Sequence, residues 1–168
     1  MDRNIVLMKI LQYIWIAAGL LTFGCDDHSH SHHGENGRNH VHTAPHGGEL
    51  YELGPHGSGF NFELFLNQEG KLDLYVLDAH AENFVRIEQS DITISMSEDN
   101  STILSLKAVP DSATGETIGN TSRFQSEKSI KDLLPLKGKI KEILIGSSSY
   151  KDEIISFSGN PEKHDHEH

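Results

Sequence analysis

The chain has 168 residues, of which 36% are hydrophobic, and its 25 acidic residues outnumber its 14 basic residues to give a net charge of −11 with histidine neutral. This excess of carboxylates repels nucleic acid phosphates, so the composition argues against polyanion binding and favours cations. A single cysteine leaves no partner for an intramolecular disulfide, and the fold must therefore rest on packing.

The first 25 residues have the pattern of a secretory signal that ends at a lipidation site. An apolar run from Ile10 to Gly24 follows Arg3 and Lys9, and Cys25 comes directly after it. Because Gln12 interrupts the run, roughly a dozen clean apolar residues remain, short of the ~20 that a membrane-spanning helix needs. We expect removal of residues 1–24 and a lipid on Cys25, which would hold the rest of the chain outside the cytoplasm.

The sequence LTFGC at residues 21–25 resembles the lipobox of bacterial lipoproteins, with Thr22 at the position where leucine is typical. The resemblance implies anchoring to a bacterial membrane, on the periplasmic side. An ordinary secretory signal followed by a free thiol is the alternative, although a free thiol is unusual in an oxidising compartment.

Two segments rich in histidine flank the central part of the chain, namely residues 25–45 and 160–168. They contain almost no apolar residues, so we expect a flexible tether and a flexible acidic tail. Neutral imidazole suits zinc, copper, nickel and cobalt, which predicts capture of a divalent transition metal with modest affinity and fast exchange. The alternative is a solvated spacer. The candidate ligands in these segments are His28, His30, His32, His33, His40, His42, His164, His166 and His168.

Between the tails, residues 46–159 alternate apolar and polar side chains with the period of β-strands. A loop closed by Asn67 and Lys71, with Gly70 in the left-handed conformation, would pair Leu66 with Leu72 and place the apolar side chains of both strands on one face. We predict an all-β domain, an antiparallel β-sandwich or open barrel of about seven or eight strands. Beyond the strands of this hairpin, expected strands cover residues 91–96, 103–109, 122–126, 139–145 and 153–157, with a loop over 111–120 and a helical turn over 129–134.

Extending the hairpin register beyond its strands predicts a metal site at its open end. Asp78 would lie opposite Phe60, His80 opposite Ser58, and His56 diagonally across from His80. Two imidazoles and a carboxylate that converge can bind a transition metal. The alternative is that Asp78 and His80 satisfy each other or the loop backbone by hydrogen bonds.

The segments APHGGEL at residues 44–50, FEL at 62–64 and LYVLDAH at 74–80 resemble a small domain of bacterial lipoproteins. They are also similar to the accessory N-terminal domain on some periplasmic adaptor subunits of heavy-metal efflux pumps of the resistance-nodulation-division class. The resemblance implies a β-sandwich connected with heavy metals, in which His46, Glu63 and Asp78 are the matching residues. The chain lacks the coiled-coil hairpin and lipoyl-like segment of those adaptors, which favours a freestanding lipoprotein.

Two details refine the expected sites. In the predicted register Glu63 points away from the apolar face and from His80, so these candidates would not all share one ion. The glycines after His46 either let the backbone pass close to a partner of its ring or only turn the chain into the first strand.

We therefore expect a membrane-anchored extracytoplasmic protein that captures or buffers divalent transition metals or delivers them to an efflux complex, and that is not an enzyme. No nucleophile elbow and no phosphate-binding glycine loop is present in the sequence. Metal binding should weaken below about pH 6, because histidine coordinates only when neutral. The competing hypothesis is a structural or protein-interaction module whose histidine-rich tails are spacers.

Overall fold

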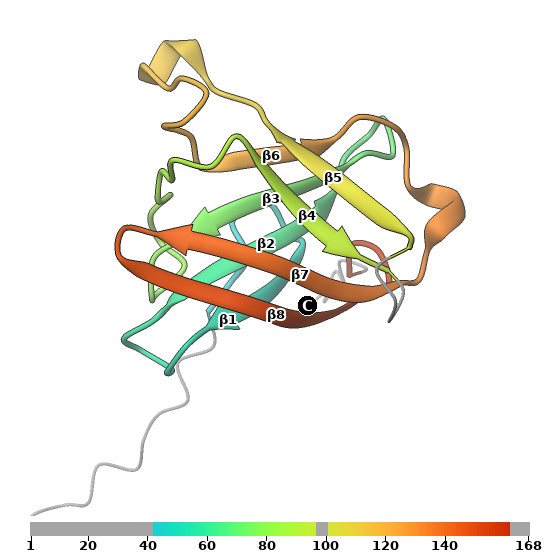
Figure 1. Ribbon diagram of the computed structural model, residues 1–168, viewed down its shortest axis with the longest axis horizontal. Coiled ribbons are helices and arrows are strands. Elements are labelled where there is room, and N and C mark those ends of the chain that lie inside the picture. Colours follow the sequence, from blue (N-terminus) through green and yellow to red (C-terminus); the bar gives the residue numbers. More distant parts are fainter. Residues whose placement is uncertain (1–41, 97–100, 162–168) are drawn as a thin grey trace, which may run out of the picture. The chain divides into compact units, whose positions relative to one another are not determined.

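The computed structural model describes residues 42–96 and 101–161, which form one antiparallel sheet of eight strands. The strand order is β1-β2-β3-β6-β5-β4-β7-β8, and the sheet curls into a nearly closed barrel (Figure 1). The predicted all-β fold is confirmed, in its open-barrel form. The strands are β1 (Glu49–Leu53), β2 (Phe60–Leu66), β3 (Leu72–Leu77), β4 (Asp91–Ser95), β5 (Ile103–Ala108), β6 (Arg123–Ser126), β7 (Leu136–Ile145) and β8 (Ser148–Phe157). Two short 3₁₀ turns, η2 (Ser112–Thr114) and η3 (Lys131–Leu133), complete the fold.

The register predicted for the first hairpin is confirmed. Leu66 pairs with Leu72, and the pairing continues along β2 and β3 to Asn61 and Leu77. The backbone N–H of Asn67 donates to the carbonyl of Lys71 at 3.0 Å, and Gly70 has a φ of 77°. The hydrophobic pattern selects this register because a slip by one residue would turn the apolar side chains outward.

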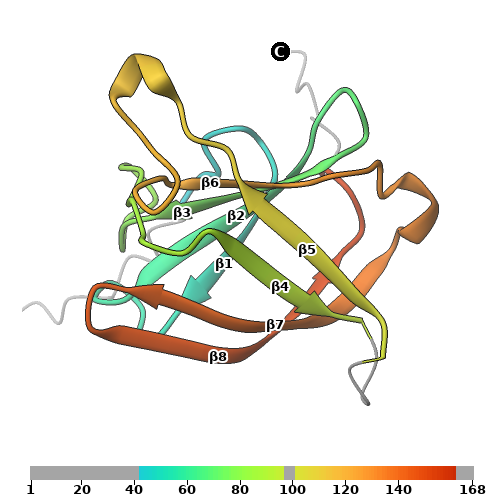
Figure 2. The same cartoon turned by 45° about the horizontal axis from the view of Figure 1, so that its top comes forward.

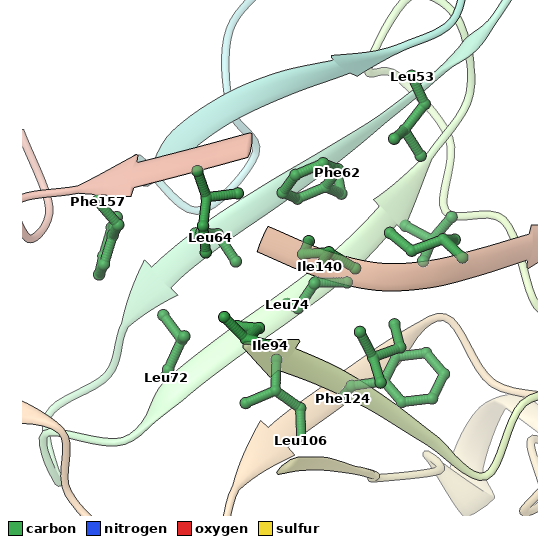
Figure 3. Close-up of a cluster of buried hydrophobic side chains, with 14 of the residues drawn as sticks. Leu53, Phe62, Leu64, Leu72, Leu74, Ile94, Leu106, Phe124, Ile140 and Phe157 are labelled. Carbon is green, nitrogen blue, oxygen red and sulfur yellow. The ribbon is translucent and has the colours of Figure 1, made fainter. Parts of the chain in front are cut away.

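Apolar side chains from all eight strands fill the interior of the barrel (Figure 3). Phe62 and Leu74 lie in this core together with Phe124, the partner of Leu74 on the neighbouring strand β6, and Ile94 of β4; these four are at most 1% exposed. Figure 2 shows β4 and β5 running diagonally between β6 and the β7–β8 hairpin. Since burial of an aliphatic or aromatic side chain contributes about 1.5–3 kcal/mol, this core is the main source of stability in a fold without disulfides.

The barrel is completed where β1 approaches the end of β8. Oε1 of Glu49 accepts hydrogen bonds from the backbone N–H and the hydroxyl of Ser158, at 3.3 and 3.0 Å. The side-chain amide of Asn160 binds both the N–H and the carbonyl of Leu66, at 2.6 and 2.7 Å. Asn160, which we assigned to the acidic tail, is therefore part of the folded domain.

The last hairpin is longer than the sequence pattern indicated. We expected strands only over 139–145 and 153–157, joined by a seven-residue connection, whereas β7 and β8 each have ten residues. The chain turns at Gly146, which has a φ of 57°. The prediction was wrong here because β8 lies at an edge of the sheet, where exposed polar residues such as Ser149 and Lys151 need not alternate with apolar ones.

The outer face of β2 and β3 is also covered, which brings polar groups into the protein. Glu63, Asp73 and Asn61 point outward from the barrel and are nevertheless at most 2% exposed. The segment before β1 and the segment after β3 supply the cover, because His46 and Phe84 both pack on the ring of Tyr75. A buried charge needs a partner. The partners of Glu63 and Asp73, which include His46 and Arg123, belong to one of the candidate sites.

Candidate functional site

Three histidines gather where the chain enters β1 and where it turns after β1 and β3. The ring centroids of His42 and His56 are 5.5 Å apart, and those of His42 and His80 are 5.7 Å apart. We call His42, His56 and His80 the rim histidines. Two ring nitrogens about 2 Å from one tetrahedral metal ion would place their ring centroids roughly 5 Å apart, so the spacing within each of these two pairs is close to that of ligands on one ion.

Two of the rim histidines, His56 and His80, lie in turns that expose them to solvent, and His42 is half-buried. His56 lies in the turn between β1 and β2, where the carbonyl of Pro55 accepts hydrogen bonds from the N–H groups of Ser58 and Gly59. The side chain of His56 is 57% exposed, and the whole residue His80 is also exposed. Exposed rings can rotate at small cost, so their nitrogens can turn toward a common point.

Glu52 orients one of these rings. Its Oε1 lies 2.6 Å from Nδ1 of His56. Among the residues that the structure describes, Nε2 of His56 has no hydrogen-bond partner. A carboxylate on one ring nitrogen, with the other nitrogen open, is the usual outer-shell arrangement of metal-binding histidines.

The rim histidines are not a finished metal centre. Within residues 42–96 and 101–161, no group of three or more His, Cys, Asp or Glu side chains is arranged to hold a metal ion as it stands. The donor set and ring spacing fit a borderline divalent cation, and rotation of the rings would have to complete the coordination.

Asp78 does not converge with the histidines as we expected. The strand pairing ends at Leu77, and a turn from Asp78 to Asn83 replaces the predicted extension opposite Phe60 and Ser58. Burial tends to raise the pKa of Asp78, but hydrogen bonds from the Asn83 amide and from the N–H groups of Glu82 and His80 outweigh it and hold the pKa below its usual value. Asp78 therefore shapes the turn that carries His80, which matches the alternative interpretation.

His46 and Glu63 form a separate pair on the covered outer face of the sheet. Nδ1 of His46 lies 2.8 Å from Oε2 of Glu63, whose side chain is fully buried. The same carboxylate accepts hydrogen bonds from the backbone N–H groups of His46 and Gly48, at 3.0 and 2.8 Å. Glu63 is thus held by three donors on the outer face of the sheet, as its position in the strand predicted.

The glycines after His46 serve both purposes that the sequence suggested. Gly47 has a φ of 78° and donates to the carbonyl of Ala44, which turns the chain toward β1. A Cβ on Gly48 would lie 2.2 Å from the carbonyl oxygen of Leu64 and 3.0 Å from Oε1 of Glu63. Only glycine lets the backbone approach the buried carboxylate this closely.

The ring of His46 also forms part of a cleft of about 690 Å³. It stacks on Tyr75 with a centroid distance of 3.9 Å, and Phe84 lies 5.7 Å from it. Arg86 and Arg123 line the same cleft. Burial, followed by the charge of Asp73, raises the pKa of Tyr75, so its phenol stays protonated at neutral pH.

Buried acids hold both arginines of the cleft. Asp73 accepts from Nε and Nη2 of Arg123 at 3.1–3.2 Å, and Oε1 of Glu116 lies 3.5 Å from Nε of Arg86. Burial tends to raise the pKa of Glu116, but hydrogen bonds from Asp111, Thr121 and Ser122 outweigh this effect and hold the pKa below its usual value. Sequence reasoning missed this cleft, although outward-facing Phe65 and Tyr75 in neighbouring strands were a signal that the outer face is covered.

The predicted lipidation site, Cys25, and most of the predicted tether and tail ligands lie outside the described residues. These ligands are His28, His30, His32, His33, His40, His164, His166 and His168. Of the tether histidines only His42 is described, and it joins the rim.

Comparisons with known proteins give this chain no relative. No protein-family model, no curated protein and no solved structure matches it. In the part of the chain that the structure describes, no helix is long and apolar enough to cross a membrane. The functional interpretation therefore depends on the sequence pattern and on the geometry of the sites.

Proposed function

We propose that this protein is a membrane-anchored extracytoplasmic binder of divalent transition metals. The single observation that carries the proposal is the convergence of His42, His56 and His80 at one rim of the barrel. Imidazole is a preferred ligand of zinc, copper, nickel and cobalt, and three of them are enough to hold such an ion with an open fourth position.

The charges around the rim support the same function. Glu52 accepts from the ring of His56 and would raise its basicity as a ligand. The chain as a whole carries a net charge of −11, which raises the local concentration of cations at its surface. Exposed ligands exchange their ion readily, and this suits capture, buffering or delivery better than permanent storage.

The proposal also includes a lipid anchor, on a residue outside the described ones, and a protein complex that receives the metal. A lipid on Cys25 would hold the domain at the periplasmic surface of a bacterial membrane, with the histidines of residues 28–42 between lipid and barrel. We further propose that metal passes from these histidines to the rim and then to a heavy-metal efflux complex. Capture of the full-length chain with such a complex, lost in the Cys25→Ala variant, is the expected result.

A zinc titration of the full-length chain tests the rim directly. Replacing the tether and tail histidines by serine first removes their contribution; these are His28, His30, His32, His33, His40, His164, His166 and His168. In that background the double change His56→Gln and His80→Gln should weaken zinc binding at least about tenfold. The matched control His46→Gln should leave it within about twofold.

Two results would contradict the proposal. Unchanged zinc binding after loss of His56 and His80 would exclude the rim, and undetectable binding once the tether and tail histidines are gone would assign the metal to those segments alone.

A further inference from the structure

The cleft beside His46 has the size and lining of a small-molecule site. Its volume is about 690 Å³, within the range of roughly 300–1,000 Å³ typical of such sites. It is built on the opposite face of the sheet from the core, and it contains none of the rim histidines. Its function can therefore be argued separately from metal binding.

An exposed aromatic surface forms one part of the cleft. Phe84 is 49% exposed, although its ring lies 5.9 Å from that of Tyr75 and 5.7 Å from that of His46. A phenylalanine supported by two other rings but open to solvent can stack against a planar ligand.

Among the described residues, the polar groups of the cleft that still lack a hydrogen-bond partner are mainly donors. Asp73 accepts hydrogen bonds from Arg123, Gln125 and Asn67, and Glu116 accepts from Thr121, Ser122 and the N–H of Asp111. These bonds are 2.8–3.2 Å long. In contrast, no hydrogen bond within the described residues involves Nη1 of Arg86 or of Arg123. Both arginines of the described residues line this one cleft.

The Nη1 groups of Arg86 and Arg123, which make no hydrogen bond within the described residues, favour a ligand with a negative charge. Nη2 of Arg86 donates to the carbonyl of Thr114 at 2.8 Å and Nε forms an ion pair with Glu116, so the guanidinium is held in place and its Nη1 is left free for a carboxylate. Asp111 also lines the cleft and is exposed, with Oδ1 bound to the N–H of Ala113. Its negative charge disfavours a ligand with a second anionic group.

We propose that this cleft binds a small monocarboxylate that carries a planar ring, with the ring against Phe84 and the carboxylate on Nη1 of Arg86. The ring of His46, fixed by Glu63 through Nδ1, leaves Nε2 toward the ligand as a further polar contact. The proposal does not depend on metal binding, since it uses different residues.

Titration of the full-length chain with benzoate, followed by the amide resonances in NMR, tests the site. We expect saturable shifts at Phe84 and Arg86 with a dissociation constant on the order of a millimolar, as befits a ligand of this size. Benzamide, which lacks the charge, and acetate, which lacks the ring, should each bind at least about fivefold more weakly.

Two variants locate the contacts. Arg86→Gln should weaken benzoate binding about tenfold, because a charge-assisted hydrogen bond is lost while Glu116 keeps its other donors. Phe84→Ala should weaken it about fivefold. The matched controls Lys151→Gln, at an exposed lysine outside the cleft, and His56→Gln, at the rim, should bind benzoate as the parent chain does.

The opposite results overturn the proposal. Absence of saturable shifts shows that the cleft takes no such ligand, and equal binding of acetate or benzamide shows that ring or charge is not recognised. Unchanged affinity in Arg86→Gln, in a variant whose amide spectrum shows that it is folded, places the carboxylate elsewhere.

Discussion

His46 and the rim histidines are side chains of one type placed in two different settings. His46 is bound through Nδ1 to a fully buried carboxylate and stacks on Tyr75. His56 is bound through Nδ1 to Glu52, which is itself half exposed, and its ring centroid lies 5.5 Å from that of His42. The same first contact therefore lies within a packed layer in one case and at the exposed surface in the other.

The comparison shows that the neighbourhood of a histidine decides its use. A ring held by buried groups on several sides contributes to structure and to the shape of a cleft, and it cannot move to join other ligands. Exposed rings grouped around one point can adapt to an ion. Substitutions that remove the carboxylate or the histidines of one setting and leave the other intact test this contrast.

The largest effect is expected at Glu63. Glu63→Ala leaves the N–H groups of His46 and Gly48 without their acceptor under the cover of the sheet, which should lower the free energy of unfolding by about 3 kcal/mol. Glu52→Ala removes the equivalent carboxylate at the rim and should cost less than about 0.5 kcal/mol. Urea denaturation of both variants measures the difference, and equal losses would show that the two settings are energetically alike.

Zinc should stabilise the protein through the rim alone. At a zinc concentration about 100-fold above the dissociation constant, binding to the folded state adds about 2.7 kcal/mol, whereas ions bound equally by the folded and unfolded chain add nothing. This gain should disappear in the double variant His56→Gln and His80→Gln and persist in His46→Gln. Thermal unfolding with and without zinc is the measurement; a gain that depends on His46 would reverse the assignment.

The parts of these sites that depend on alternation could be predicted from sequence. Period two in residues 60–66 and 72–77 gave the register of the first hairpin and the outward direction of Glu63. The turn at Asp78 could not be predicted in this way, because a side chain that accepts from the backbone of its own loop follows no period.

The position of His42 was also beyond the sequence pattern. A polar, histidine-rich stretch has no hydrophobic periodicity from which the position of His42 could be predicted. The ring of His42 lies at the rim because the chain turns before β1. The cleft was missed for a related reason: Phe84, Arg86 and Arg123 come from segments that only the curled sheet brings together.

The surroundings of Glu116 are intermediate between those of His46 and those of the rim histidines. Its carboxylate is nearly buried and lies next to an exposed arginine, Arg86. Its pKa is lowered in the folded protein, so its contribution to stability is present above its ordinary value of 4.5 and is lost as the pH falls through the lowered folded value. Glu116→Gln should cost about 1 kcal/mol at pH 7 and nothing below that window. Urea denaturation at neutral and acidic pH checks this, and a cost that did not change with pH would mean that the charge of Glu116 is unimportant.

The most direct test of the central contrast is paramagnetic broadening by copper. Substoichiometric Cu²⁺ added to the full-length chain, with the histidine ring resonances followed by NMR, reports which rings lie beside the ion. We predict that the signals of His42, His56 and His80 disappear together while that of His46 remains sharp. Loss of the His46 signal, with the rim signals unchanged, would contradict the account.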